Sequence, residues 1–482
     1  MKGVEGEEGR TARAGRATTT ALLAISVLAF PIPYGAVLPG GRLLIQALAF
    51  LALATSATIV SRPAIGAARL ALVSLLGVAI LGTLQLAPLP LPLLVRLSPV
   101  SAEIHSRANE VLALFGRDSI TPRISIAPTE TLQATLFIAA CAALFIAASA
   151  VSSRATRRWL GWLVVFAAAA QIVWAVTTQR DDERIHGAFV NPNHFAGYLQ
   201  IALAVTFAFV VESILTGGDR EARKRDPLEK MHSKWAPIAW RVLAWGVIVI
   251  GILVTRSRGG IVAAAASSIV MLVVALSMRH VRHHRAFATA GSGAIVAGVA
   301  LALATTGRWP LLRFFATDPR DAESDLRVTL WRLSIEAWRD FPIFGSGLGT
   351  FREAFRRVQP AGTNLLVEQA HHDALQMLVT GGVVGLALSA FAIVTIGCLL
   401  ARGAISNRHR EGSAWSLAGL GAIVALTLHG LVEFNFSIPA IPATLAIVTG
   451  LAWGSAREEE KGGAGDSSVE ESRGPRALTP MA

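Results

Sequence analysis

Residues 374–401 read ALQMLVTGGVVGLALSAFAIVTIGCLLA, a run of 28 residues that contains no Asp, Glu, Lys or Arg. Because about 20 apolar residues in a helix cross the hydrocarbon core of a bilayer, this run predicts a membrane-spanning helix. The same rule applied along the chain predicts an all-α membrane protein with about twelve transmembrane helices. The predicted spans are residues 19–38, 43–60, 66–86, 132–151, 159–176, 195–215, 237–255, 260–278, 286–306, 374–401, 413–430 and 437–455.

The composition supports a membrane protein and argues against several other classes. Of the 482 residues, 53% are hydrophobic, more than the core of a soluble protein of this length requires. The two cysteines, Cys141 and Cys398, both lie in predicted spans, so neither a disulfide framework nor a thiolate metal site is indicated. The net charge of +12 comes mainly from short loops between spans, which is typical of cytoplasmic loops and not of a nucleic-acid-binding face.

The distribution of basic residues predicts the orientation of the chain. All five lysines fall on one side of the predicted spans, and the positive-inside rule assigns that side to the cytoplasm. Residues 1–18 are then a cytoplasmic tail, residues 19–455 the membrane domain, and residues 456–482 a cytoplasmic tail predicted to be disordered. Because another span follows the first at once, the first is predicted to be a retained helix and not a cleaved leader.

Two larger segments, residues 87–131 and 307–373, are predicted to face the outside. The second, between the ninth and tenth spans, is a large loop expected to contain short interfacial helices. All basic residues on the outer side are arginines, and a guanidinium matches a phosphate group with two hydrogen bonds. An outer face of this kind suits a diphosphate ligand, although a general codon preference for Arg explains the same pattern.

The loop before the sixth span gathers polar side chains where a helix is predicted to begin. Residues 184–198 read RIHGAFVNPNHFAGY. Pro192 fixes the backbone and Asn caps helix starts, so Asn191, Asn193 and His194 are expected at the positive end of a helix beside Arg184. This arrangement suits an anion or sugar hydroxyls. A loop and helix cap without a ligand is the alternative.

The turn between the seventh and eighth spans, residues 255–260, reads TRSRGG. Its Arg256 and Arg258 lie on the side where the positive-inside rule disfavours basic residues. Arginines whose stems snorkel to the membrane surface explain this placement in structural terms. The alternative is functional: a basic residue at a membrane turn on the side that the positive-inside rule disfavours indicates a functional site.

Within the large outer loop, residues 326–340 alternate apolar and polar side chains at helical spacing, with Arg327 on the polar face and Trp331 and Trp338 beside the apolar one. This pattern predicts a helix at the membrane interface, which either packs on the bundle or contacts a lipid substrate. Residues 341–351, FPIFGSGLGTF, follow it. Since no strand precedes these glycines, they predict a flexible turn and not a dinucleotide-binding loop.

Histidines flank the last three predicted spans. His371, His372 and Asp373 directly precede the tenth span. Helical metal pairs stand four residues apart whereas adjacent residues point about 100° apart, so proton transfer by a histidine is favoured over metal binding. His429 and Glu433 stand at the end of the eleventh span as an ionisable pair, which is consistent with structural pairing and with support of catalysis.

Together these segments resemble the O-antigen ligase and O-antigen polymerase superfamily of bacterial membrane glycosyltransferases. The resemblance covers about residues 130–450 and rests on residues 187–198, 257–259, 327–351, 370–376 and 429–435. It implies undecaprenyl-diphosphate-linked glycans as donors, without a nucleotide sugar, metal or other cofactor. By position, it assigns the functional histidine to His371 and the binding of the donor diphosphate to Arg184 and Arg258, with Arg256 beside them. The chain departs from the family pattern at His372, where Asn is usual, and at Ala374, where an aromatic residue is usual.

The resemblance implies transfer or polymerisation of a lipid-linked glycan at the periplasmic face of the bacterial inner membrane, with both termini cytoplasmic. The acceptor remains open: lipid A core for a ligase, a glycan for a polymerase, a protein hydroxyl for an oligosaccharyltransferase. A polysaccharide transporter or flippase is the alternative of a different class, but it needs ionisable residues near the midplane, and here charges cluster at span ends. The residues expected to support the site are Asn191, Asn193, His194, His372, Arg327, His429 and Glu433.

Overall fold

A computed structural model describes residues 2–32, 34–59, 68–179, 184–216, 227–278, 322–360, 362, 366–407 and 409–471. Within these ranges every regular element is helical, which confirms the predicted all-α class for this part of the chain. The α-helices are α1 (Lys2–Ala29), α2 (Pro39–Ser56), α3 (Ala68–Leu86), α4 (Leu91–Leu97), α5 (Pro99–Leu114), α6 (Pro128–Val151), α7 (Arg154–Thr178), α8 (Pro192–Thr216), α9 (Pro227–Val254), α10 (Arg258–Ser277), α13 (Ala322–Asp340), α14 (Phe351–Phe355), α15 (Asp373–Ser406), α16 (Arg410–His429) and α17 (Ala440–Glu471).

Eight of the described helices are long and apolar enough to cross a membrane: α2, α6, α7, α8, α9, α10, α15 and α16. Shorter apolar stretches, Leu76–Leu86 and Ala440–Ser455, lie in α3 and α17. The predicted span at 286–306 and the start of the predicted loop 307–373 lie outside the described residues. The chain is therefore a membrane protein with multiple spans, and the number twelve stays a prediction.

Two helices extend beyond the predicted spans into the predicted tails. Helix α1 begins at Lys2, and α17 continues to Glu471, past the predicted end of the last span at residue 455. No proline lies between residues 443 and 474, so no residue there removes a helical backbone hydrogen bond. The length of an apolar run therefore predicts which part of a helix can lie in a bilayer. It does not predict where the helix ends.

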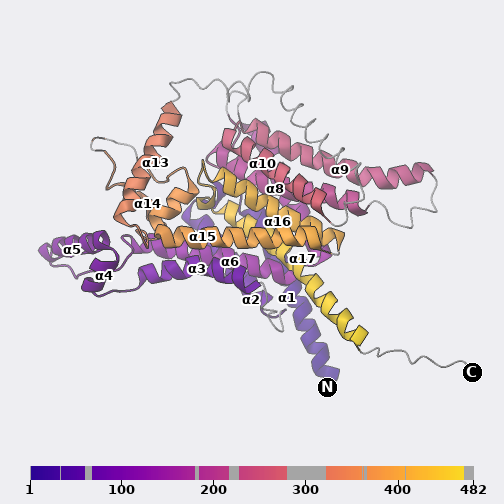
Figure 1. Cartoon of the computed structure of the whole chain (residues 1–482), viewed down its shortest axis with the longest axis horizontal. Coiled ribbons are helices and arrows are strands. Elements are labelled where there is room, and N and C mark those ends of the chain that lie inside the picture. The colour runs from indigo at the N-terminus through magenta and orange to yellow at the C-terminus, as the bar shows by residue number, and fades with distance from the viewer. Residues whose placement is uncertain are drawn as a thin grey trace, which may run out of the picture.

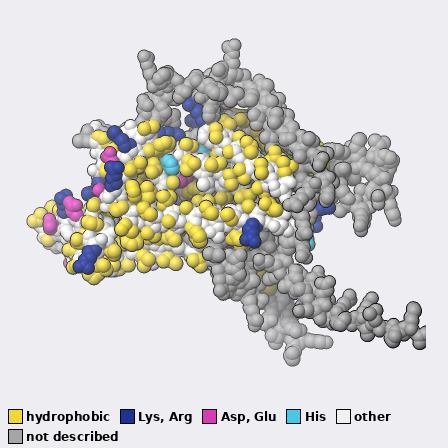
Figure 2. Space-filling model, in the orientation of Figure 1, with side chains coloured by type: hydrophobic (Ala, Val, Ile, Leu, Met, Phe, Trp, Pro, Cys, Tyr) yellow, Lys and Arg dark blue, Asp and Glu magenta, His cyan; other side chains and the backbone are white. Residues whose placement is uncertain are grey.

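The long helices form one elongated bundle, and α13, α14, α4 and α5 lie at one of its ends (Figure 1). Helices α8 and α16 pack on each other in its interior, and 83% of each apolar window is buried. Small residues permit this close packing: a Cβ added at Gly421 of α16 would lie 2.2 Å from the sulfur of Met271 in α10. Figure 2 shows hydrophobic side chains over the visible face, with most of the acidic side chains in view at the α4–α5 and α13 end.

Helix α15 is broken near its start. Gly382 has φ 65° and ψ −167°, a conformation that residues with a Cβ avoid. The amide groups of Ser346 and Gly347 donate to the carbonyls of Val379 and Thr380, at 3.0 and 3.1 Å. The amide of Val383 donates to Pro342 at 2.9 Å. The glycine-rich turn thus satisfies the backbone groups that the break exposes.

The side chain of Gln85 in α3 hydrogen-bonds both the glycine-rich turn and the broken part of α15. Its Nε2 donates to the carbonyls of Phe344, at 2.6 Å, and Thr380, at 3.0 Å, and its Oε1 accepts from the amide of Leu348 at 2.9 Å. Gly345, Gly347 and Gly349 in the turn all have positive φ. The turn predicted to be flexible is therefore held in place, and it fixes the first turns of α15, which follow His371.

Helix α13 contains the predicted interfacial helix 326–340, and it packs on the bundle. Leu330, Leu333 and Ala337 are buried in a cluster that includes Phe341 and Phe351. The indole of Trp338 donates to the carbonyl of Pro342 at 3.1 Å, but Leu326 and Val328 on the same helix are exposed. Of the two expectations for this helix, packing on the bundle is observed for its inner face.

Candidate functional site

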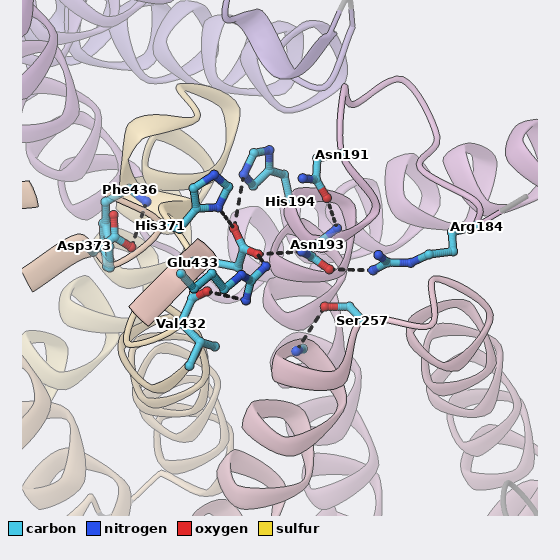
Figure 3. A network of polar contacts seen from close by, with 12 residues as sticks. Arg184, Asn191, Asn193, His194, Ser257, His371, Asp373, Val432, Glu433 and Phe436 are labelled. Atoms are coloured by element: carbon cyan, nitrogen blue, oxygen red, sulfur yellow. Dashed lines mark hydrogen bonds and ion pairs between the residues drawn. The ribbon is translucent and has the colours of Figure 1, made fainter. Parts of the chain in front are cut away.

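Several helix ends meet at the end of the bundle where α15 begins. These are the starts of α8, α10 and α15, the end of α16, and the loop between α16 and α17, with α13 across them. Side chains from α8 and the loop before it, from α13, from the segment just before α15 and from the loop between α16 and α17 form one network of polar contacts (Figure 3). Positive helix N-termini, which favour negative charge, therefore face the same region.

The carboxylate of Glu433 is the centre of this network, and its side chain is only 1% exposed. Its Oε1 accepts hydrogen bonds from Arg327 Nη2 at 2.7 Å and from Asn193 Nδ2 at 2.5 Å. Its Oε2 lies 3.3 Å from His371 Nδ1 and 3.9 Å from His194 Nε2. Four residues predicted from the sequence as separate site candidates thus converge on a fifth.

Glu433 is an anion in this environment. Burial by itself would raise the pKa of the carboxyl group, but the hydrogen bond with His371 and the charges of Arg327, His371 and His194 outweigh it and lower the pKa to about 2. A buried charge that is paired and hydrogen-bonded in this way is stable in the folded protein. The site therefore has a fixed negative charge behind His371.

His371 is the partly exposed member of the network. Its side chain is 31% exposed, and its ring meets the ring of Phe434 edge-on at 4.7 Å. The indole of Trp331 donates to its carbonyl at 3.4 Å. Its φ of 50° is unusual for a residue with a Cβ and costs about 1 kcal/mol or more. The surrounding contacts hold His371 in a strained backbone conformation, a feature found at many functional sites.

His372 has a different role from its neighbour. Its ring nitrogen Nδ1 accepts a hydrogen bond from the amide of Leu375 at 3.4 Å, so it caps α15. Its ring also meets the indole of Trp331 edge-on at 5.4 Å. Burial lowers the pKa of His372, which favours the neutral ring that a capping acceptor needs. Its expected support of the site is therefore structural.

Asp373 connects the start of α15 to the loop that carries Glu433. Its amide donates to the carbonyls of Gly430 at 2.7 Å and Glu433 at 3.1 Å, and its Oδ2 accepts from the amide of Phe436 at 3.3 Å. From the sequence, Asp373 was a candidate only as a metal ligand. Its partners are backbone groups about 60 residues away, which no local motif indicates. Among the described residues, no group of three or more His, Cys, Asp or Glu side chains could hold a metal ion.

Arg184 joins the network through an amide. Its Nη2 donates to Asn193 Oδ1 at 2.6 Å, and its Nε donates to the carbonyl of Thr255 at 3.2 Å. The side chain of Asn191 accepts from the amide of Asn193 at 2.8 Å and so shapes the turn before α8. Arg184 therefore connects the loop before α8 with the turn before α10.

The turn before α10 packs against the Glu433 loop. A Cβ added at Gly259 would lie 2.6 Å from Val432 Cγ2 and 3.3 Å from His429 Cδ2, so only glycine fits there without a shift. Arg258, the first residue of α10, is partly buried beside this contact. Arg256 is exposed on the same turn and has φ 53°. The predicted arginine turn is thus adjacent to the network.

His429 does not pair directly with Glu433, although both were expected to form a pair. Glu433 binds Arg327 and His371, and Arg327 Nη1 also donates to the neighbouring carbonyl of Val432 at 3.1 Å. Both ring nitrogens of His429 are buried without a hydrogen-bond partner among the described residues, as are both polar atoms of the Asn435 side chain. The Glu433 carboxylate therefore contacts residues that are distant in the sequence and not His429, four residues before it.

The fold and the site define a class: a polytopic helical membrane protein with a buried carboxylate that supports a partly exposed histidine among arginines. Residues 242–390 match the model of a protein family described as O-antigen ligase. The match supports membership of the O-antigen ligase superfamily, which the sequence motifs indicated. It covers Arg258, Arg327 and His371, whereas Arg184 and Glu433 lie outside it. No curated protein matches the chain.

The family match indicates the general type of activity. It supports glycan transfer of the O-antigen ligase or polymerase type by a membrane glycosyltransferase, with lipid-linked glycans and their acceptors as partners. Together with the apolar helices, it also indicates a bacterial membrane protein.

Proposed function

We propose that this protein transfers a glycan from an undecaprenyl-diphosphate-linked donor to an acceptor hydroxyl, as an O-antigen ligase does, with His371 as the general base. The observation that carries the proposal is the contact of 3.3 Å between His371 Nδ1 and the buried carboxylate of Glu433. A carboxylate only accepts hydrogen bonds, so it favours the tautomer with the proton on Nδ1. Nε2 is then the basic nitrogen available to a substrate.

The reaction is a single displacement in this proposal. The acceptor oxygen attacks the anomeric carbon of the donor while His371 Nε2 takes the hydroxyl proton. The bond between that carbon and the phosphate oxygen breaks, and undecaprenyl diphosphate leaves with the electron pair. Attack opposite to the leaving group inverts the anomeric configuration. Glu433 stays ionised and stabilises the imidazolium that forms.

Arg184 and Arg258 are the proposed ligands of the donor diphosphate, with Arg256 at the rim of the same turn. Arg258 begins α10, so the positive end of the helix adds to its charge. Cationic groups at this position offset the negative charge that develops on the leaving group, and no metal or cofactor is required. Arg327 has a different function, because it binds Glu433 at 2.7 Å and compensates its charge.

The site is proposed to face the periplasm, with both termini in the cytoplasm. Arg410, at the start of α16, lies at the opposite end of that helix from His429. Arg154, Arg157 and Glu411 form ion pairs at that opposite end, and the lysines were assigned to the same side. The greater share of basic residues there agrees with the positive-inside rule.

Deletion of the gene in the source organism, followed by complementation, tests the proposal. His371→Ala and Arg258→Ala should fail to restore surface glycan at normal protein levels, and the lipid-linked donor should accumulate on the outer leaflet. His409→Ala and Arg402→Ala are matched controls, because both side chains are exposed at the opposite end of the bundle. Restoration of normal glycan by both site variants would refute the assignment. Donor trapped on the inner leaflet would indicate a flippase instead.

A further inference from the structure

The side chain of Asn193 lies between Arg184 on one side and Glu433 on the other (Figure 3). Its Oδ1 accepts from Arg184 Nη2 at 2.6 Å, and its Nδ2 donates to Glu433 Oε1 at 2.5 Å. The residue is 7% exposed. Asn193 was expected from the sequence to bind an anion or sugar hydroxyls, but both polar atoms of its side chain are engaged with protein groups.

The two partners of Asn193 require an amide between them. A guanidinium only donates hydrogen bonds, and a carboxylate only accepts them. A side chain that bridges them must therefore accept on one side and donate on the other, as the amide of Asn does. These partners also fix the orientation of the amide, since the reverse orientation would set donor against donor and acceptor against acceptor.

The bridge is built at a fixed position in the fold. Pro192 restricts the backbone before Asn193, and the side chain of Asn191 accepts from the Asn193 amide at 2.8 Å. Arg184 is also anchored on the carbonyl of Thr255, at 3.2 Å. A change in the position of the guanidinium is therefore transmitted through one short side chain to the carboxylate.

We infer that Asn193 is a positioning residue that couples the arginine proposed to bind the donor to the Glu433–His371 pair. The inference rests on the proposed function for the roles of Arg184 and His371. Binding of the diphosphate at Arg184 then sets the position of Glu433, and through it the direction of the His371 ring. The base is aligned when the donor is bound, and Asn193 itself touches neither the donor nor the acceptor.

Asn193→Asp and Asn193→Ala separate this coupling from a packing role. The charged and titratable groups around the position are Glu433, Arg184, Arg327, His371, His194, His429 and Asp373. Asn193→Asp keeps the shape but places a second carboxylate against Glu433, which raises the pKa of Glu433. A proton shared between the two carboxylates at lower pH restores a donor at the bridge. Asn193→Ala offers no such donor at any pH.

The assay uses the full chain purified in detergent and mixed with solubilised membranes of a deletion strain, which supply donor and acceptor. Released undecaprenyl diphosphate is measured. Both variants should lower the transfer rate by about 10- to 100-fold at about pH 8. Between about pH 8 and about pH 5, Asn193→Asp should recover about tenfold relative to wild type, whereas Asn193→Ala should not recover. Asn191→Ala loosens the turn that carries Asn193 but adds no titratable group, so whatever its transfer rate it should keep the pH dependence of the wild type.

A second readout does not depend on transfer. Diethyl pyrocarbonate modifies unprotonated imidazoles, and peptide mass spectrometry follows His371 among the histidines. The added negative charge in Asn193→Asp should move the pH range of His371 modification upward relative to wild type and Asn191→Ala. Coincident modification profiles would overturn the coupling even if the proposed function holds. Conversely, wild-type transfer by His371→Ala would refute the proposed function, while a shifted profile would still support the coupling.

Discussion

Replacement of Glu433 by Gln removes the negative charge at the centre of the network with little change in shape. Glutamine resembles the protonated form of the acid, so the pKa of Glu433 indicates the cost. A pKa lowered from 4.5 to about 2 corresponds to about 3 kcal/mol of folding free energy at neutral pH. Since the pKa is lowered on folding, this stability is fully present above about pH 4.5 and is lost as the pH falls towards 2.

The transfer activity of Glu433→Gln should fall by more than the loss of folded protein explains. Without the carboxylate, the ring of His371 loses the acceptor that selects its tautomer, and the imidazolium loses its counter-charge. Loss of the analogous carboxylate in a serine protease lowers turnover by about 10,000-fold. We expect Glu433→Gln to reduce the transfer rate per folded molecule by at least about 100-fold, because the contact of 3.3 Å is longer than an ideal hydrogen bond.

Two measurements on the same detergent-purified samples test this expectation. Thermal unfolding between about pH 7 and about pH 3 follows stability, and release of undecaprenyl diphosphate follows transfer. Glu411→Gln is the matched control. Glu411 lies 3.1 Å from Arg157, whose side chain is only 3% exposed, but this pair is at the opposite end of α16. The control should lose stability and retain its transfer rate per folded molecule.

Any of three results would refute the reasoning. Near-normal transfer by folded Glu433→Gln would mean that His371 does not need the carboxylate. An equal loss of transfer in Glu411→Gln would mean that any broken ion pair in the bundle inactivates the protein. A stability difference that persists unchanged at about pH 3 would contradict the low pKa of Glu433.

Other positions give independent expectations. Gly382→Ala should destabilise the protein by about 2 to 4 kcal/mol, because the new Cβ would lie 2.2 Å from the carbonyl oxygen of Ile343 at a φ of 65°; size-exclusion profiles of the detergent extract should show the loss of folded protein. Gly259→Ala should push the arginine turn away from Val432 and weaken donor binding, seen as a higher KM with a smaller change in kcat, while an unchanged KM would contradict the proposed place of Arg258. Transfer should persist after dialysis against a chelator, and loss of activity that added divalent cations restore would argue against charge stabilisation by arginines alone.

Much of the fold was predictable because hydropathy depends on local sequence. The run 374–401 predicted the part of α15 that suits a bilayer, and the prediction for α10 began two residues after its observed start at Arg258. The break at Gly382 was not predicted, since an apolar run does not reveal the backbone φ within it. The glycine-rich turn that stabilises the break lies about 35 residues earlier in the chain.

The members of the site were more predictable than its arrangement. His371 and Arg184 were candidates from the family resemblance, Asn193 from its place at a predicted helix start, and Arg327 from the polar face of the predicted interfacial helix. The central role of Glu433 was not predicted, because its partners Asn193, Arg327 and His371 are 240, 106 and 62 residues away in the chain. Its neighbour in sequence, His429, was the expected partner and is not the observed one. Local spacing identifies residues that need partners, whereas only the packing of helices decides which partners they find.

Gln85 has a consequence for the synthesis of the protein in the membrane. Its side chain is made early, whereas its partners Phe344 and Thr380 follow 259 and 295 residues later. At about 5 to 20 residues per second, the ribosome needs about 15 to 60 s to supply the last of them. During this interval the amide must be hydrated or held by another component at the membrane surface. Chains that stop before α15 lack the carbonyl of Thr380, so an incomplete copy leaves one of the two acceptors of the Gln85 amide group missing.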